Sequence, residues 1–335
     1  MSDAKNRQVL LKARPESIPQ AEHFEVTESA VPEPGEGQFL LRNAFLSVDP
    51  AMRGWVSAVA NYSEPVALGA VMRAITVGQV VASRHPDYRE GEWVCGLFGW
   101  QDYALSDGSN VWFKHHYDDL PVSTSLGLLG INGITAYFGL LDAGRPKAGD
   151  TVVVSTAAGA VGSAVGQIAR IKGCRTVGIT STPEKMALCR EVYGFDAALS
   201  YREGDLDAAL AAACPDGVNV YYDNTAGAIS DAVYRQLALG ARCVICGTAS
   251  LSSWDPWPEG PRIERHLLVK RASIQGILLF DFAERFAEAR AALAGWLREG
   301  KLAYREEVLD GIEEAPGSIA RLYASENVGK LLIRL

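Results

Sequence analysis

The sequence predicts an α/β protein that combines a doubly wound parallel sheet with a second, β-rich part. Short β-branched or aromatic runs, separated by Pro and Gly, fill residues 1 to about 122, and strands alternate with helices from about 123 onward. Within the second region, residues 151–162 have the pattern of a strand, a glycine turn and the start of a helix. A chain of 335 residues is also long enough to form two cores.

The first part is expected to form a small barrel or sandwich, because it contains many short strands and frequent turn signals. Pro32-Glu-Pro-Gly35 and Glu90-Gly91 are such signals. The candidate strands are residues 8–11, 24–28, 38–45, 76–83 and 93–98.

The second part is expected to hold a six-stranded parallel sheet with helical crossovers. A small, apolar segment at 126–142 reads as a buried helix before it, and 282–299 reads as an amphipathic helix after it. The candidate strands are residues 151–155, 175–180, 197–200, 218–223, 241–247 and 273–280, and the candidate helices between them are 163–172, 183–193, 206–213 and 228–239.

The tail of the chain is expected to return to the first part. The sheet is complete at residue 280, yet a further helix (312–323) and strand (330–334) follow. The predicted domains are therefore a first part at 1–122, an inserted sheet domain at 123–299 and a returning segment at 300–335.

Composition limits the partners. The net charge of −8 disfavours a broad nucleic-acid or anionic-membrane surface. No run of eighteen apolar residues is long enough to span a membrane, and the polar N-terminus lacks a signal-peptide core. Six scattered cysteines fit reduced thiols in a cytoplasm. Cys243 and Cys246 form a C-x-x-C that reads as two core thiols, with a redox pair as the alternative.

The turn after residue 155 is a candidate dinucleotide-phosphate site. Ala157, Gly159 and Gly162 occupy the three positions of a G-x-G-x-x-G fingerprint. A turn without bulky side chains lets a pyrophosphate approach the backbone, and the following helix N-terminus adds partial positive charge. The alternative is a plain structural turn.

The residues after the second strand of this sheet favour NADP. An NAD site places an acid at this strand end to hold the ribose hydroxyls, and no acid follows Thr180 directly. Ser181 and Thr182 offer hydroxyls instead, and Lys185 lies in the first turn of the next helix, within reach of a ribose phosphate. The alternative is an exposed lysine on a capped helix, beside Glu184.

A zinc site is not expected. Catalytic zinc needs several Cys, His or carboxylate ligands in tetrahedral reach. The first part has one cysteine, Cys95, and histidines that are far apart in sequence or adjacent. His115 and His116 are adjacent, so in a strand their rings would point to opposite sides rather than to one metal. Both are expected on the solvated surface.

A set of short motifs runs nearly from end to end of the chain: Asn6–Gln8, Ser47–Arg53, Asn61-Tyr62, Gly133–Gly139, Ala157–Ser163, Glu184-Lys185, Tyr221–Asn224, Val269–Arg271 with Gln275-Gly276, and Glu326–Lys330. Taken together, these motifs resemble those of the zinc-free alkenal/enone reductases of the medium-chain dehydrogenase/reductase superfamily.

The resemblance implies a GroES-like catalytic domain made of both chain ends, an inserted Rossmann domain, a cleft that holds NADPH, and a homodimer. It also implies roles for individual residues. These are Lys185 and Tyr201 at the 2′-phosphate, Ala158, Gly159 and Val161 at the pyrophosphate, and Thr135, Asn224 and Asn327 toward the nicotinamide.

The implied activity is NADPH-dependent reduction of the activated C=C bond of α,β-unsaturated ketones or aldehydes. A quinone reductase of the same superfamily and a non-catalytic nucleotide-binding protein are the alternatives. Ala51 and Val269 stand where relatives carry tyrosines, which leaves Tyr62 as the leading side-chain donor to the developing enolate. Tyr62 is expected on a loop that runs from Asp49; alternatively, it only packs against the substrate or Pro65.

Overall fold

A computed structural model describes residues 5–58, 62–251, 253–254 and 256–335. Asn61, Ser252 and Asp255 lie outside the described residues. The chain divides into two compact units. Unit 1 contains the described residues of Met1–Leu126 together with Glu306–Leu335, and unit 2 is Gly127–Arg305. Both changes of unit fall a few residues later in the chain than the sequence boundaries at 122 and 299.

Unit 2 contains the parallel sheet that the sequence predicts, and the α/β fold class is confirmed. Within the described residues the six strands are ordered β10-β9-β8-β11-β12-β13, and every neighbouring pair is parallel. Chain order therefore reverses between β8 and β11, which is the switch point of a doubly wound sheet. The strands are β8 (Thr151–Ser155), β9 (Arg175–Thr180), β10 (Ala197–Ser200), β11 (Val218–Asp223), β12 (Leu237–Ile245) and β13 (Ser273–Gly276).

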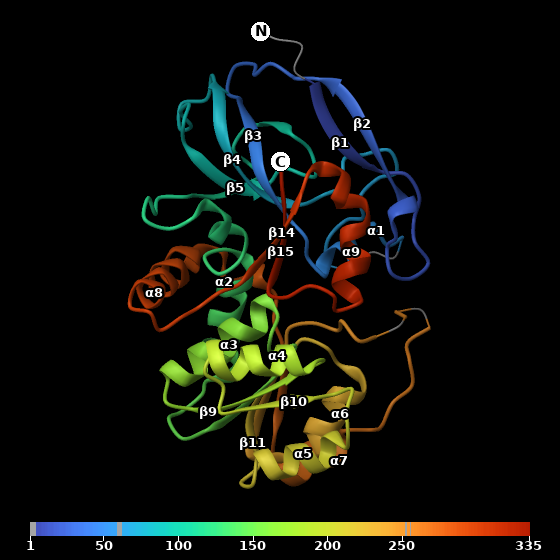
Figure 1. The fold of residues 1–335 in the computed structure, drawn as a ribbon, viewed down its shortest axis with the longest axis vertical. Coiled ribbons are helices and arrows are strands. Elements are labelled where there is room, and N and C mark those ends of the chain that lie inside the picture. Colours follow the sequence, from blue (N-terminus) through green and yellow to red (C-terminus); the bar gives the residue numbers. More distant parts are fainter. Residues whose placement is uncertain (1–4, 59–61, 252, 255) are drawn as a thin grey trace. The chain divides into compact units, whose positions relative to one another are not determined.

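Helices cover this sheet, with α3 and α4 on one side and α5, α6 and α7 on the other (Figure 1). The helices of unit 2 are α2 (Ile131–Phe138), α3 (Ala160–Ile171), α4 (Pro183–Ala187), α5 (Leu206–Ala213), α6 (Gly227–Arg235), α7 (Glu264–Lys270) and α8 (Phe286–Arg298). Short π-helical turns extend α2 and α4 to Gly144 and Val192, and a 3-10 turn (Leu279–Arg285) precedes α8.

One helix end differs from the sequence prediction. The helix expected at 228–239 ends at Arg235, and β12 begins at Leu237. Leu237 pairs with Val218 of β11 and is 1% exposed. Strand pairing and burial therefore outweigh the helical preference of Ala and Leu at this point.

Unit 1 combines a two-stranded ribbon with a seven-stranded sheet in the described residues. The sheet follows the order β14-β15-β3-β4-β5-β7, and β6 also pairs with β3. β15 pairs with β3 in antiparallel orientation, and β14 pairs with β15. The C-terminal strands therefore complete the sheet of the N-terminal segment (Figure 1). The strands are β1 (Lys5–Leu11), β2 (Phe24–Ala30), β3 (Phe39–Ser47), β4 (Ile75–Ser83), β5 (Trp93–Leu97), β6 (Tyr103–Ser106), β7 (Val111–Lys114), β14 (Glu306–Asp310) and β15 (Lys330–Arg334).

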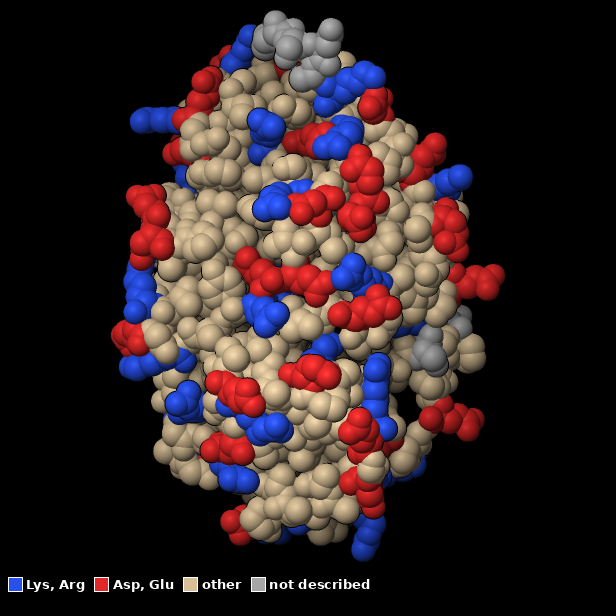
Figure 2. Space-filling view, viewed as in Figure 1, with Lys and Arg blue, Asp and Glu red and all other residues tan. Residues whose placement is uncertain are grey.

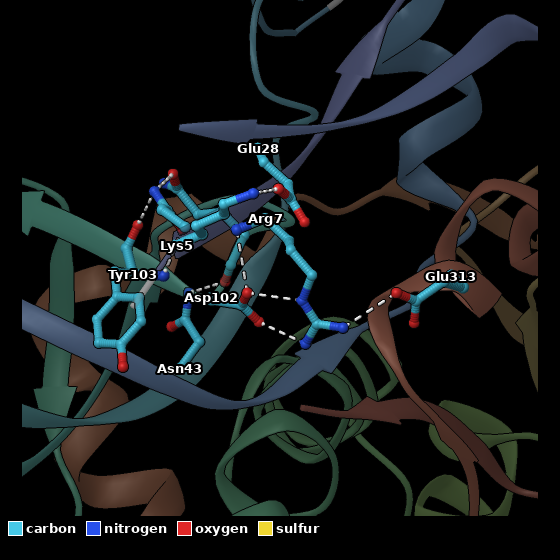
Figure 3. Close-up of polar contacts among 9 residues, drawn as sticks. Lys5, Arg7, Glu28, Asn43, Asp102, Tyr103 and Glu313 are labelled. Atoms are coloured by element: carbon cyan, nitrogen blue, oxygen red, sulfur yellow. Dashed lines mark hydrogen bonds and ion pairs between the residues drawn. The ribbon is translucent and has the colours of Figure 1, made fainter. Parts of the chain in front are cut away.

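An ion pair fixes β1 to this sheet (Figure 3). The Arg7 guanidinium donates to both carboxylate oxygens of Asp102, at 2.9 and 3.0 Å, and its remaining nitrogen donates to Glu313 at 3.0 Å. Asn6 adds a hydrogen bond to the Tyr103 carbonyl. The hydrogen bond to Asp102 is the main reason that the pKa of Arg7 is raised.

The segment after Asp49 forms a helix, α1 (Ala51–Val56), so the loop expected from Asp49 to Tyr62 was wrong over these six residues. Met52, Trp55 and Val56 are spaced for one helix face and are buried. They share a core cluster with Ile319 of α9 (Ala315–Tyr323). Among the described residues, no helix is long and apolar enough to cross a membrane.

Candidate functional site

The candidate cofactor residues of unit 2 gather at the carboxyl edge of the parallel sheet. The pairing register places Ser155 beside Ile179 and Thr180 beside Ser200, so β8, β9 and β10 end at the same level. β11 ends beside them, since Tyr222 pairs with Val154. Ligands of doubly wound sheets bind at this edge, at the switch point.

The turn between β8 and α3 leaves the first-turn N–H groups of α3 without a side-chain cap. Thr156 has a φ of 55°, in the left-handed region, and its carbonyl accepts from the Gly159 N–H at 2.9 Å. Gly159 is the N-cap of α3, and a glycine has no side chain with which to cap the first-turn N–H groups. These donors, together with the helix dipole, suit a pyrophosphate.

Two glycines let this turn close tightly. A Cβ on Gly162 would lie 2.2 Å from the Thr156 carbonyl oxygen, and a Cβ on Gly159 would lie 3.0 Å from the Thr156 methyl group. Ala158 is buried and Val161 is half-buried beside them. Small residues are therefore required by the backbone here, and the turn fits the phosphate group that the sequence predicts.

Ser181, Thr182 and Lys185 follow β9 directly, at the carboxyl edge of the sheet where the sequence predicts a 2′-phosphate. Thr182 caps α4, and its hydroxyl accepts from the Lys185 N–H at 3.3 Å. The Lys185 side chain is half-buried, and Ser181 is 4% exposed. Hydrogen bonds from its own N–H and from the Thr182 hydroxyl lower the pKa of Glu184, so an anion stands beside this lysine.

The segment after β10 adds a residue that the sequence reasoning missed. The Tyr201 N–H donates to the Thr180 carbonyl at 3.1 Å, which ties the end of β10 to the end of β9. The Arg202 guanidinium lies over the Tyr201 ring, 5.7 Å from its centroid. Arg202 is therefore a second candidate cation besides Lys185, and it lies next to Tyr201. In the sequence, only its position directly after that tyrosine could have indicated it.

At the switch point, a buried network orients Asn224. The Asn224 amide donates to the Ser155 carbonyl at 2.7 Å, and its backbone N–H donates to the Ser155 hydroxyl at 2.8 Å. The fully buried Asp223 carboxylate accepts from the Thr225 N–H at 2.8 Å and from the Ser230 hydroxyl at 2.6 Å. Burial, followed by the Asp223 charge, raises the pKa of Tyr221. The network fixes the turn that presents Asn224.

Thr135 lies on α2 and is tied to the same sheet. Its carbonyl accepts from the hydroxyl of Tyr222 at 3.0 Å. Gly133 allows this helix to start close to the preceding segment, because a Cβ there would lie 1.8 Å from the Leu128 carbonyl oxygen. The Thr135 side chain is half-buried.

Asn327 and Tyr62 belong to unit 1. Asn327 is 8% exposed, and its amide donates to the Gly329 carbonyl at 2.8 Å. Tyr62 follows α1 and is 49% exposed. Burial raises the pKa of Tyr323 to about 12; Arg53 opposes the increase, and Tyr62 adds to it.

His115 differs from its expected place on the solvated surface. It is half-buried, and its ring nitrogens contact the Ser125 hydroxyl at 2.8 Å and the carbonyls of Tyr117 and Leu120. His116 is exposed. Across the described part of the chain, no group of three or more His, Cys, Asp or Glu side chains could hold a metal.

Both cysteines of the C-x-x-C are free thiols. Burial is the largest cause that raises the pKa of Cys243 to about 12 and that of Cys246 to about 11. Cys243 is buried and Cys246 is half-buried, and a protonated thiol is a poor nucleophile. This pattern agrees with core thiols rather than with a redox pair.

The sequence matches two family profiles and known reductases along its length. The profiles are described as "N-terminal domain of oxidoreductase" (residues 7–113) and "Zinc-binding dehydrogenase" (residues 160–295). The chain is 44% identical to NADPH-dependent curcumin reductase of Escherichia coli, covering 99% of this chain and 97% of that protein. It is 34% identical to the NADP(+)-dependent 2-alkenal reductase of Nicotiana tabacum, over 99% and 98% of the two chains.

A solved structure agrees over the same extent. CurA from Vibrio vulnificus in complex with NADPH is 42% identical, with a TM-score of 0.92 over 98% of each chain. The chain therefore belongs to the medium-chain dehydrogenase/reductase superfamily, in the group that contains the curcumin, 2-alkenal and prostaglandin reductases.

Proposed function

We propose that this protein reduces the activated C=C bond of α,β-unsaturated ketones or aldehydes with NADPH. The observation that supports this most is the carboxyl edge of the parallel sheet. There the Lys185 segment after β9, the glycine turn after β8 and the Asn224 turn after β11 lie side by side in this order, so the turn proposed for the pyrophosphate is in the middle. The relatives that match over the whole chain carry names for this cofactor and for such substrates.

In this proposal, the chain's own residues bind and orient the cofactor. Ala158, Gly159 and Val161 line the pyrophosphate, and Ser181, Lys185 and Tyr201 hold the 2′-phosphate. Asn224, Thr135 and Asn327 contact the cofactor toward its nicotinamide end. Arg202 adds positive charge beside Tyr201.

When bound, reduced nicotinamide supplies the hydride that the β-carbon of the substrate accepts. The substrate oxygen then gains negative charge, and a preorganised donor stabilises it. Tyr62 is the proposed donor, since a phenol with an ordinary pKa near 10 stays protonated at neutral pH.

A panel of substrates tests the proposed function. NADPH oxidation should be steady with enones and enals and absent with simple quinones. Turnover of quinones alone would favour the quinone reductase, and no turnover of any compound would favour a non-catalytic nucleotide-binding protein.

Lys185→Ala tests cofactor selection. A lysine–phosphate contact at a partly exposed site contributes about 1–2 kcal/mol, so NADPH affinity should fall roughly tenfold. NADH affinity should stay unchanged, because NADH lacks the phosphate. Titration of both cofactors measures the difference. The matched control is Lys147→Ala, since Lys147 is exposed just before β8, at the opposite edge of the sheet. Equal losses for both cofactors in Lys185→Ala would show that Lys185 does not recognise the phosphate.

The reaction is proposed to be independent of zinc. In this proposal, the Tyr62 hydroxyl stabilises the negative charge that develops on the substrate oxygen. A zinc ion is therefore not needed to polarise that oxygen. Prolonged chelation should leave the rate with an enone unchanged, and elemental analysis should find no stoichiometric metal. One tightly bound zinc per chain, lost together with activity, would contradict this reading.

The protein is further proposed to be a cytoplasmic homodimer without a nucleic-acid or membrane partner. Six free cysteines fit a reducing compartment.

β13 is the last strand of its sheet, and apolar side chains near it, Leu268, Val269 and Leu278, are exposed. An edge strand with such neighbours can pair with a second copy. Figure 2 shows acidic and basic side chains interspersed on one face. A mixed surface of this kind favours binding neither to nucleic acid nor to an anionic membrane.

A further inference from the structure

A buried ion pair in unit 1 joins two segments that are far apart in sequence. The Lys330 ammonium lies 2.6 Å from the Asp49 carboxylate, and the two side chains are 5% and 4% exposed. Lys330 also donates to the Val48 carbonyl at 3.0 Å, and the Ser47 hydroxyl donates to the second Asp49 oxygen. The polar atoms of the pair are thus held by several partners.

The stability of the fold does not by itself explain such a pair. Removing two charges from water has a large desolvation cost, and apolar residues of similar volume often stabilise a core at least as well. The location of the pair is more informative. Asp49 stands just before α1, which leads to Tyr62, and Lys330 follows shortly after Asn327. The pair therefore connects the segments that carry both proposed site residues of unit 1.

A second contact joins the same two segments. The Tyr323 hydroxyl donates to the Pro50 carbonyl at 3.0 Å. The Arg53 guanidinium, whose residue is 5% exposed, lies 5.6 Å from the centroid of the Tyr323 ring. Tyr323 precedes Asn327 and Lys330 follows it, so the segment 323–330 holds the segment 47–53 on both sides of Asn327.

The far end of the Tyr62 loop is anchored as well. Arg14 donates to the Val56 carbonyl at 3.0 Å and to the Val66 carbonyl at 2.7 Å. The Val66 N–H donates to the Trp55 carbonyl at 2.8 Å. The described residues on either side of Tyr62 are thus held at Val56 and at Val66.

We propose that Asp49 and Lys330 are a positioning pair for the reduction, which sets the base of the Tyr62 loop against the turn that carries Asn327. The proposal rests on the proposed function of Tyr62. Donors to a developing charge must be held to about 0.5 Å, and that precision requires support from neighbouring groups. Neither residue of the pair contacts the reacting atoms in this account.

The test is a mutant cycle on the full-length protein. The background variant combines Asp49→Asn with Lys330→Met, which removes both charges and keeps similar side-chain sizes. Either change alone leaves an unpaired buried charge and should lower Tm by roughly 5–10 °C, whereas the combination should recover most of this loss. A role in stability alone would restore activity together with Tm.

The positioning role predicts a different result. The double variant should keep NADPH affinity within about threefold of the original protein, and its kcat for an enone should fall about tenfold. Tyr62→Phe should lower kcat about 10²-fold in the original background, but less than tenfold in the double variant, because the hydroxyl is already displaced.

The matched control is another ion pair of unit 1, Arg7 with Asp102 (Figure 3). Arg7→Met combined with Asp102→Asn should lower Tm and leave the full effect of Tyr62→Phe on kcat. If the Asp49/Lys330 variant does not fold, Tyr323→Phe replaces it, since it removes only the hydroxyl that holds Pro50. This variant should lower kcat several-fold at an unchanged Tm.

Two results would overturn the proposal, and they are distinguishable. In the first, Tyr62→Phe lowers kcat by the full 10²-fold in every background, and the double variant or Tyr323→Phe keeps a normal kcat. Tyr62 would then remain the donor, and the pair would be purely structural. A Tyr62→Phe protein as active as the original would contradict the role of Tyr62 itself, and the positioning proposal would fail with it.

Discussion

Gly162→Ala should lower NADPH affinity by about 10²-fold or more. The added methyl group would lie 2.2 Å from the Thr156 carbonyl oxygen, and a carbonyl of the backbone cannot move without opening the turn. Overpacking of this kind costs about 1–3 kcal/mol of stability as well. The displaced turn would no longer present its N–H groups to the pyrophosphate.

Gly295→Ala is the matched control, because Gly295 also lies inside a helix, α8. A Cβ there meets no other described atom within 4 Å, apart from its chain neighbours and the backbone of its own helix. The substitution should keep NADPH affinity and raise stability by up to about 1 kcal/mol, as glycine is a poor helix former. Titration of NADPH and thermal unfolding measure both effects. Normal NADPH affinity in Gly162→Ala would mean that the pyrophosphate does not lie on this turn.

Tyr62→Phe should lower kcat with an enone about 10²-fold and leave NADPH affinity intact. The substitution keeps the ring and removes only the hydroxyl, so it separates a hydrogen-bond donor from a packing surface. The loss of one donor to a developing oxyanion has an effect of about this size. The fall should appear equally in kcat and kcat/KM, because the interaction forms only in the transition state.

The alternative for Tyr62 predicts a different kinetic pattern. A tyrosine that only packs against the substrate would contribute equally to ground state and transition state. Tyr62→Phe would then keep the original kcat, and Tyr62→Ala would raise KM through loss of the ring. In that case the donor would be the cofactor's ribose hydroxyl or a water molecule.

The central strands of the parallel sheet, β8, β9 and β11, could be predicted closely because they are buried on both faces. Strands β8, β9 and β11 begin and end at the expected residues, since runs that contain β-branched residues are followed directly by turn or cap signals. The candidate residues at the carboxyl edge followed from that prediction, because parallel strands end together. Lys185 could be chosen as a candidate from its position after β9 and from the helix start at Thr182 alone.

Other elements depend on contacts that local sequence does not reveal. β14 has the sequence Glu-Glu-Val-Leu-Asp, which lacks a strand pattern and gains its place by pairing with β15. α1 follows a Pro and contains Gly54, and it forms because its apolar residues enter the core. The Asp49–Lys330 pair joins residues 281 positions apart, so no motif in either segment indicates it.

The fate of the hydride is the most direct test of the proposed reaction. The protein is supplied with an enone and with NADPH that carries deuterium at both C4 positions, and the product is analysed by NMR. The expected product is a saturated ketone with one deuterium on the former β-carbon, formed in equal amount to the NADPH consumed. Deuterium on the carbonyl carbon of an alcohol product, or NADPH oxidation without reduction of the C=C bond, would contradict it.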